Sequence, residues 1–245
     1  MEWSDTGIVL SARRHGEAAA VVSILTETHG RHAGLVRGGA SRRHRSTVQP
    51  SNRVAATWRA RLEDHLGAYV VELLESPAAH WFEDPGRLAA LSSACGIVDA
   101  TLPEREPCQS VYNDLSEFFK ILNQENWPAL YVAWELTLLA DLGFGLDLGQ
   151  CAVTGASEDL AYVSPKSGRA VSVAAAAPYR DRLLRLPAFL IGDGPAGDAA
   201  VADGLALTGY FLDRHLFAPY RRKLPEPRSR LLDRLRRKAS AKDDE

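Results

Sequence analysis

The 245-residue chain has little of what disulfide frameworks and membrane spans require. Its three cysteines, Cys95, Cys108 and Cys151, are widely spaced and odd in number. Such cysteine usage argues against a disulfide framework and is typical of a reducing compartment. No apolar run approaches the roughly 20 residues of a membrane helix, and the first residues lack the basic and apolar stretches of a signal peptide. We therefore expect a cytoplasmic protein without a membrane partner.

Motifs for common catalytic chemistry are also missing. None of the seven histidines lies in an HExxH or similar metal-ligand spacing. The glycine-rich stretches at 38–39 and 192–195 lack the Gly-Lys-Ser/Thr ending of a phosphate-binding loop. The run Ser164-Pro165-Lys166-Ser167-Gly168 contains Ser-x-Lys, but such a run is typical of a solvated turn. We expect no catalytic centre, no cofactor and no small-molecule substrate, and hence a protein that is not an enzyme.

Acidic residues are absent from one long segment of a chain whose formal net charge is only −2. No Asp or Glu lies between Glu27 and Glu63, where eight arginines fall: Arg31, Arg37, Arg42, Arg43, Arg45, Arg53, Arg59 and Arg61. Guanidinium groups suit bidentate contact with phosphate, and each phosphate neutralised releases bound counterions. The segment therefore favours nucleic-acid binding over ordinary surface charge. The histidines at 15, 29, 32 and 44 lie among these arginines, and we expect them at the surface or facing nucleic acid.

The first eighty residues predict a small β-barrel. Segments with alternating or β-branched residues, separated by turn residues, lie at 6–12, 19–26, 31–37, 53–62 and 67–74. Five short strands suit a five-stranded barrel of oligonucleotide-binding (OB) type, and strand count alone leaves an SH3-like barrel open. Residues 38–45 predict a flexible basic loop. Trp58 could stack on a base, but alternation along its strand favours the core for Trp58 and the surface for Arg59 and Arg61.

After Pro77 the apolar spacing becomes that of helices. We expect helices at 85–100, 110–122 and 128–142, an irregular insert at 146–172, and further helices near 178–184, 198–216 and 228–238. Residues 239–245 read as a disordered tail. The predicted fold class is therefore multi-domain α+β, with a barrel at 1–80 and an α-helical domain at 81–238 that carries the insert.

Several stretches, in order along essentially the whole chain, resemble the bacterial recombination mediator family RecO. In the barrel region they are GIVL at 7–10, RHGE at 14–17, GRH at 30–32 and VRGG at 36–39; in the helical region they are ELTLLADLGFGLDL at 135–148, CAVTG at 151–155 and YVSPKSG at 162–168. The resemblance implies an N-terminal OB barrel, an α-helical domain and a small insert.

In some members of that family the insert is a zinc knuckle with four cysteines. Here Cys151 occupies the first ligand position, Thr154 stands where the second cysteine would be, and no cysteine follows. One thiolate cannot form a tetrahedral zinc site. We therefore expect no bound metal, and an insert held by packing and hydrogen bonds.

The resemblance implies a nucleoid-associated protein of DNA repair. Members bind single- and double-stranded DNA, anneal complementary strands, and act with RecR to load the RecA recombinase onto DNA covered by single-strand-binding protein. The residues that we assign to DNA contact are Arg13, Arg14, Arg31, Arg37, Arg42, Arg43, Arg45, Arg59 and Arg61, with Lys166 and Arg169 as weaker candidates in the insert. A protein-interaction scaffold, whose barrel binds a polypeptide instead of DNA, remains an alternative because OB barrels do both.

The helical domain of the family also receives the acidic C-terminal tail of single-strand-binding protein. That tail ends in an aromatic residue and a carboxylate, so its receptor needs a cation beside an apolar groove. The residues that fit this chemistry are Arg228 and Arg230, with Phe217, Leu224 or Leu231 nearby. A solvated basic terminus is an equally good interpretation, and the break Pro225-Glu226-Pro227 puts the match of the local backbone in question.

Overall fold

The computed structural model describes residues 1–42, 44–62 and 64–243. The chain divides into two compact units, Met1–Phe119 with Pro225–Arg228, and Lys120–Leu224 with Ser229–Glu245. The expected boundary near residue 80 marks the change from strands to helices, but the first helices belong to the same compact unit as the strands. Among the described residues, no helix is both long and apolar enough to cross a membrane.

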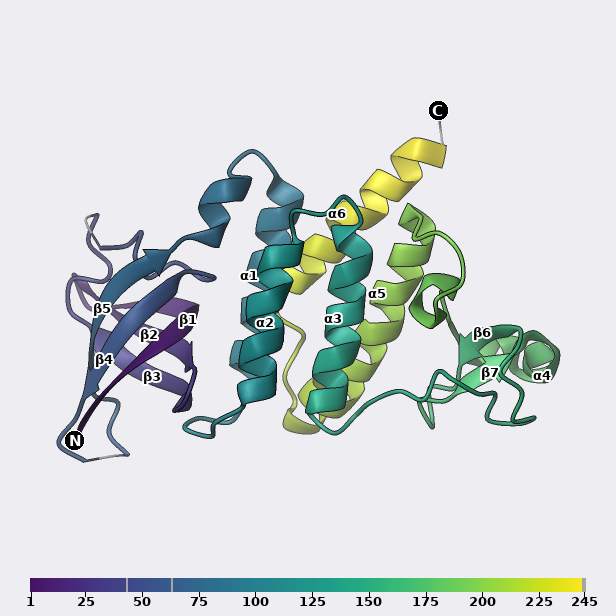
Figure 1. The fold of residues 1–245 in the computed structure, drawn as a ribbon, viewed down its shortest axis with the longest axis horizontal. Coiled ribbons are helices and arrows are strands. Elements are labelled where there is room, and N and C mark those ends of the chain that lie inside the picture. The colour runs from purple at the N-terminus through teal and green to yellow at the C-terminus, as the bar shows by residue number, and fades with distance from the viewer. Residues whose placement is uncertain (43, 63, 244–245) are drawn as a thin grey trace. The chain divides into compact units, whose positions relative to one another are not determined.

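The first unit contains a closed five-stranded barrel, drawn in purple to blue in Figure 1. Its strands are β1 (Glu2–His15), β2 (Ala19–Thr26), β3 (Gly30–Val36), β4 (Arg53–Arg59) and β5 (Ala68–Glu75). They follow the order β1-β2-β3-β5-β4, and β1 pairs antiparallel with both β2 and β4. The pairing of β3 with β5 is parallel and joins only two residue pairs. The α+β fold with a five-stranded barrel at its N-terminus is confirmed.

Strand β1 is longer than the sequence pattern indicated. Its first half, Glu2–Ile8, pairs with β4, and its second half, from Gly7 to His15, pairs with β2. The register shifts between Val9 and Ser11. Such a bulge bends a strand, which lets β1 close the barrel by serving two neighbours. Residues 2–5 escaped prediction because they lack an alternating apolar pattern.

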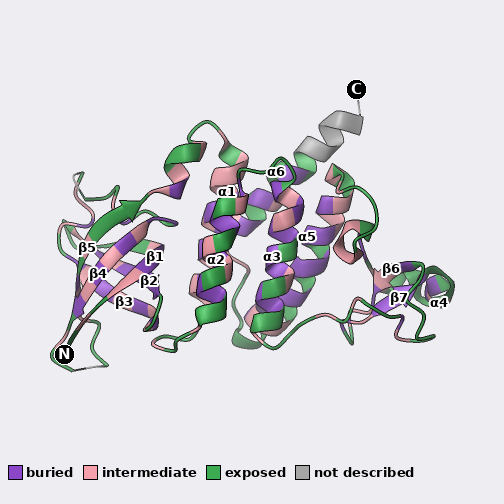
Figure 2. Ribbon diagram, viewed as in Figure 1, coloured by how far each residue is buried: buried purple, intermediate pink, exposed green. Residues whose placement is uncertain are grey.

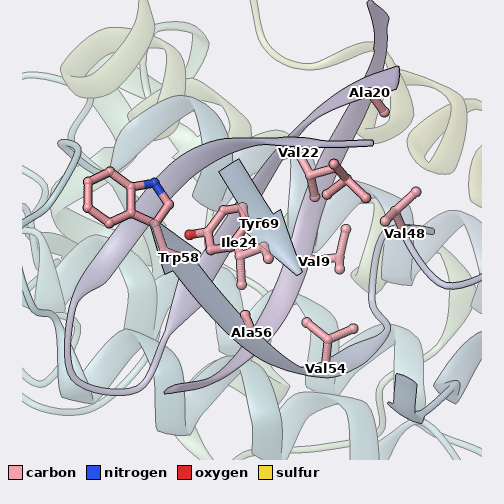
Figure 3. Packing of buried hydrophobic residues seen from close by; sticks show 10 residues of the cluster. Val9, Ala20, Val22, Ile24, Val48, Val54, Ala56, Trp58 and Tyr69 are labelled. Carbon is pink, nitrogen blue, oxygen red and sulfur yellow. The ribbon is translucent and has the colours of Figure 1, made fainter. Parts of the chain in front are cut away.

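Buried residues alternate with half-buried ones along β3 and β4 (Figure 2). Figure 3 shows how the side chains from the strands meet inside the barrel. Trp58 is 1% exposed, and its indole Nε1 donates to the Leu66 carbonyl at 3.0 Å. Gly67 has a φ of 66°, and a Cβ there would lie 2.4 Å from Nε1 of Trp58, so only glycine fits. The core position of Trp58 and the surface positions of Arg59 and Arg61 are confirmed.

The segment between β3 and β4, residues 37–52, is here called the basic loop. The flexibility expected at 38–45 stays a prediction, and hydrogen bonds join the described residues of the loop to the barrel at several points. The Ala40 amide donates to the Ala18 carbonyl at 2.9 Å, and the Asn52 side chain donates to the carbonyls of Ser46 at 2.7 Å and Thr47 at 3.0 Å. Val48, 2% exposed, belongs to the barrel core. The described residues of the loop therefore pack against the barrel.

Two helices complete most of the first unit: α1 (Pro85–Thr101) and α2 (Gln109–Ile121), after a 3₁₀ turn at Pro77–Trp81. The Asp84 carboxylate caps α1 by accepting from the amides of Gly86 at 2.9 Å and Arg87 at 3.0 Å. Pro85 occupies the first turn, where its missing N–H is harmless. Both helices begin and end within one residue of the predicted positions.

The second unit is built on α3 (Trp127–Asp141), α5 (Asp198–Leu212) and most of α6 (Glu226–Asp243). Gly204 lets α5 approach α3 closely, because a Cβ there would lie 2.9 Å from Cγ1 of Val132. The Thr208 hydroxyl on α5 donates to the fully buried Glu135 carboxylate on α3. After α5 a π-helical turn, Asp213–Phe217, and a 3₁₀ turn, Ala218–Tyr220, follow. Helix α6 continues through Asp243, past the predicted end at Lys238.

The insert is more regular than the sequence indicated. It contains β6 (Leu160–Val163) and β7 (Ala170–Ser172), which form a three-stranded sheet of order β7-β6-β8 with β8 (Leu184–Arg185). The expected helix at 178–184 is instead the short α4 (Val173–Ala176) and a 3₁₀ turn, Ala177–Arg182, which leads into β8. A second 3₁₀ turn lies at Ala188–Ile191. These strands are too short to produce a recognisable apolar period.

Candidate nucleic-acid interface

Two hollows lie on the surface of the barrel, and the basic loop borders both. The β5 hollow has a volume of about 430 Å³ and is lined by Val36, Arg37, His44, Thr47, Arg59, Ala68, Tyr69, Val70 and Val71. The β1 hollow has a volume of about 400 Å³ and is lined by Ala12, Arg14, Ala20, Gly39, Ala40, Arg45, Val48, Gln49 and Pro50. Each hollow combines two arginines with apolar side chains. A nucleotide needs both, because its phosphate pairs with cations and its base packs against apolar surface.

In the β5 hollow two arginines and a histidine come from three elements. Arg37 follows the end of β3, His44 lies in the basic loop, and Arg59 ends β4. Arg59 donates to the Glu2 carboxylate at 2.8 Å, and this hydrogen bond and the charge of Glu2 raise the pKa of Arg59. Val70, 68% exposed, contributes apolar wall. The hollow therefore offers both arginines at its rim and an apolar surface against which a base could pack.

In the β1 hollow the Arg14 guanidinium is held in place by the β1–β2 turn. It donates to the carbonyl of Gly16 at 3.2 Å and to that of Glu17 at 3.0 Å. Arg45 faces it from the basic loop and is exposed. Its own backbone amide donates to the Ser41 carbonyl at 2.9 Å, which closes a turn. A fixed arginine on a strand thus shares a hollow with an exposed arginine on the loop.

Three other residues that we predicted to contact DNA lie outside both hollows. Arg13 on β1, Arg42 in the basic loop and Arg61 after β4 are all exposed. Arg43 lies outside the described residues. The structure therefore brings together Arg14 with Arg45, and Arg37 with Arg59, and leaves Arg13, Arg42 and Arg61 exposed outside the two hollows.

The assignment of Arg31 to DNA contact needs a correction, because its side chain bonds to other residues of the protein. Its Nε donates to the Leu102 carbonyl at 2.8 Å. Its Nη1 lies 3.5 Å from Oδ1 of Asp99 and 3.4 Å from Oε1 of Glu104, and the side chain is only 16% exposed. These bonds join β3 to the C-terminal end of α1, so the guanidinium already has partners within the protein. This geometry favours a structural role for Arg31 over DNA contact.

The histidines of the barrel region are not all surface groups. His32 is 3% exposed, and burial, with the nearby charge of Arg105, lowers its pKa. His29 stacks on Trp3 with ring centroids 4.1 Å apart, and its Nδ1 lies 2.9 Å from the Asp5 carboxylate. Burial raises the pKa of Asp5, but hydrogen bonds from His29, Thr28 and Thr6 lower it overall. Trp3 thus contacts both histidines, and sequence reasoning missed this cluster because Trp3 lies more than twenty positions from them.

In the insert, the two weaker candidates differ in their surroundings. Lys166 is exposed in the turn before β7. Arg169 is half-buried, and its Nε donates to the Asp147 carboxylate at 3.1 Å. Sequence reasoning missed Arg214, which donates to the carbonyl of Pro165 beside Lys166. Only the fold brings Arg214 to this turn, since the two residues are 49 positions apart.

The cysteine-poor loop of the insert is held by hydrogen bonds. Cys151 is 1% exposed, and its Sγ accepts from the Ser172 amide at 3.3 Å and the Ser172 hydroxyl at 3.5 Å. Burial acts to raise the pKa of this thiol, whereas hydrogen bonds from Ser172 and Thr154 lower it below its ordinary value. The Ala152 amide donates to the Ala170 carbonyl at 2.7 Å. Within the described part of the chain, no three His, Cys, Asp or Glu side chains gather as metal ligands.

The five residues expected to receive an acidic tail do not form an accessible set. Phe217 is 1% exposed, Arg228 is 3% exposed and Leu231 is fully buried. Leu224 is half-buried and Arg230 is exposed. The combination of cation and apolar groups is present in the sequence, but only Leu224 and Arg230 offer surface to a peptide.

Comparison with known proteins gives matches along nearly the whole chain. The family described as Recombination protein O N terminal matches residues 1–77, and Recombination protein O C terminal matches residues 82–225. A DNA repair protein RecO from Rhodospirillum centenum is 56% identical over 239 residues, which cover 97% of this chain and 96% of that protein. The protein of the same name from Rhodospirillum rubrum is 52% identical over 249 residues, covering 98% and 99%. A third, from Cereibacter sphaeroides, is 50% identical over 237 residues, covering 97% and 99%.

The role of Arg31 can be separated from DNA binding by substitution. We expect Arg31→Ala to lower the free energy of unfolding by about 1–3 kcal/mol, because it removes a charged hydrogen bond and leaves Asp99 without its cation. DNA affinity and its salt dependence stay unchanged. Urea denaturation and fluorescence anisotropy measure the two effects. Arg37→Ala, at an exposed arginine on the rim of the β5 hollow, is the matched control with the opposite pattern. Weaker DNA binding by Arg31→Ala at unchanged stability would refute the structural role.

The metal content of the insert is also testable. We expect the purified protein to contain no stoichiometric zinc by elemental analysis, and a chelator to leave its thermal unfolding unchanged. Cys151→Ala should lower the free energy of unfolding by about 1 kcal/mol, because it removes a buried hydrogen-bond acceptor. Cys108→Ala, at a half-buried thiol, is the control and should have a smaller effect. One zinc per chain, lost together with stability on chelation, would contradict the expectation.

Proposed function

Because the chain belongs to the RecO family of DNA repair proteins, we propose that it acts as a recombination mediator that binds DNA through its barrel. In this proposal it binds single- and double-stranded DNA and anneals complementary strands. With RecR it helps load RecA onto DNA that single-strand-binding protein covers. It is not an enzyme in this proposal, since annealing makes and breaks no covalent bond.

The distribution of charge on the barrel is the observation that carries the proposal. Residues 28–62 contain no acid, and the basic loop within them places Arg37 and Arg45 at the rims of two hollows. Arg42 adds an exposed cation on the same loop. Clustered guanidinium groups without neutralising carboxylates attract a phosphate backbone and release its counterions. Among the described residues, the Glu2–Arg59 pair is the one place on these rims where an acid partly offsets a cation.

Annealing follows from the same charge. Two DNA strands repel each other within the Debye length, which is about 10 Å at 0.1 M salt. A cationic surface that contacts both backbones lowers this repulsion, and base pairing then supplies the sequence specificity.

A protein-interaction scaffold is the second candidate, and one observation favours it. Strand β5 pairs with β3 only at Ala68 and Tyr69, so within the described barrel the remaining edge of β5 lacks a partner strand on that side. Val70, Leu73 and Leu74 on this strand are exposed. An unpaired edge with apolar side chains can accept a strand from another polypeptide. This would compete with DNA at the β5 hollow, since Val70 lines it.

We further propose that the second unit receives the acidic tail of single-strand-binding protein. The cation and the apolar side chain that remain accessible for it are Arg230 and Leu224. Arg230 lies on α6 and Leu224 just before that helix.

The salt dependence of DNA binding tests the main proposal. We expect the triple variant Arg42→Ala, Arg43→Ala and Arg45→Ala to bind single-stranded DNA more weakly. The slope of log affinity against log salt should fall by about 0.7 for each phosphate that the variant no longer neutralises. Fluorescence anisotropy with a labelled oligonucleotide at several salt concentrations measures both.

A triple variant of equal charge change is the control. Arg180→Ala, Arg182→Ala and Arg185→Ala removes three exposed arginines from the second unit and should leave the slope unchanged. If the loop variant kept the affinity and slope of the unaltered protein, the barrel would not be the DNA interface, and the scaffold candidate would be favoured.

Tail binding has its own test. A synthetic peptide with acidic residues and a C-terminal aromatic residue should bind, and Arg230→Ala should weaken it by removing the accessible cation. Lys223→Ala, which removes another exposed cation near α6, is the control. Isothermal titration calorimetry gives the affinities. Equal affinity of the unaltered protein and Arg230→Ala would place the tail elsewhere.

A further inference from the structure

We propose that the basic loop separates two single-strand sites, so that one barrel holds two DNA strands at once, one in each hollow. This inference rests on the proposed function and deepens it. It assigns strand capture to either hollow alone and annealing to the two together.

Neighbouring residues of the loop face different hollows. His44 lines the β5 hollow, whereas the next residue, Arg45, lines the β1 hollow. The same alternation recurs with Thr47, which lines the β5 hollow, and Val48, which lines the β1 hollow. The loop is thus a wall between the hollows, with side chains on both of its sides.

Each hollow has its own pair of cations from different elements. Arg37 and Arg59 belong to the β5 hollow, and Arg14 and Arg45 belong to the β1 hollow. None of the four is shared. The volumes, about 430 and 400 Å³, lie at the lower end of the range for small-ligand sites. Each hollow is therefore the size of a site for one nucleotide with its phosphate at the rim.

Hydrogen bonds attach the basic loop, which separates the two hollows, to the barrel. The Asn52 side chain is fully buried and donates to two loop carbonyls, and its Oδ1 accepts from the Ser76 hydroxyl at 2.9 Å. Gly39 fits so closely that a Cβ would lie 3.1 Å from the Val36 carbonyl oxygen. Because these bonds hold the loop at the barrel, the two hollows cannot merge into one groove without breaking them.

This arrangement has a consequence for annealing. Two strands on opposite sides of one loop are held next to each other, and separate cations neutralise each backbone, which lowers the repulsion between the strands. Arg42 adds an exposed cation on the same loop. A barrel with one hollow disabled still captures a strand, but it no longer brings two strands together.

The test counts oligonucleotides bound per chain. Short oligonucleotides of about 8 nucleotides, non-complementary and of different mass, are mixed with the full-length protein and counted by native mass spectrometry. The variants are Arg37→Glu in the β5 hollow and Arg45→Glu in the β1 hollow. Arg182→Glu is the matched control, since Arg182 is exposed, belongs to the second unit and lines neither hollow. The annealing rate of complementary strands is measured on the same proteins by energy transfer between labels.

We expect two oligonucleotides on the unaltered chain and on Arg182→Glu, and one on each hollow variant. Each hollow variant should anneal at close to the protein-free rate while it still binds one strand, and the variant with both changes should bind none. Circular dichroism confirms that each variant is folded.

A single oligonucleotide on the unaltered chain at saturation would overturn the inference while leaving the proposed function intact. So would a hollow variant that retains full annealing. If the double variant bound DNA as well as the unaltered chain, DNA binding by the barrel itself would fail, and the proposed function with it.

Discussion

The basic loop keeps its shape because the buried amide of Asn52 bonds to it. That side chain donates to the carbonyls of Ser46 and Thr47 and accepts from Ser76, while its backbone carbonyl accepts the Val9 amide at 2.9 Å. Loop, barrel and the start of the helical region thus meet at one fully buried residue. Without these bonds the loop carbonyls would need water, and the side chains that line the two hollows would have no defined positions.

The arginines of the barrel divide into two groups that charge alone does not distinguish. Arg31 is joined to Leu102, Asp99 and Glu104, so its charge is satisfied within the protein. Arg37 and Arg45 have exposed side chains on the loop. Sequence reasoning placed all three together because the partners of Arg31 lie about 70 positions away, beyond the acid-free segment. The burial of each arginine and its bonds within the protein therefore distinguish a structural arginine from one that is able to contact a phosphate. The number of cations in the segment does not.

Much of the fold was predictable because its signals are local. The strands of the barrel, the core position of Trp58 and the ends of α1 follow from alternation, capping and helical spacing over a few residues. The two hollows were not predictable, since they arise where loop residues meet strands from elsewhere in the chain. The conformation of the basic loop was not predictable either, because it depends on hydrogen bonds from the side chain of Asn52. The sheet of the insert was not predicted, because a strand as short as β7 is too short to show an alternation of apolar and polar residues.

The insert is held by hydrogen bonds at the position where the family resemblance implies the first zinc ligand. A zinc knuckle is stable only while metal is supplied and its thiolates stay reduced. In this chain Cys151 is a buried hydrogen-bond acceptor for Ser172, and backbone bonds such as Ala152 to Ala170 hold the loop. Loss of one thiol to oxidation would therefore remove two weak hydrogen bonds and would not release a coordination centre. Oxidation would also add oxygen atoms to a thiol that has almost no exposed surface, so this region depends on close packing around a single sulfur atom.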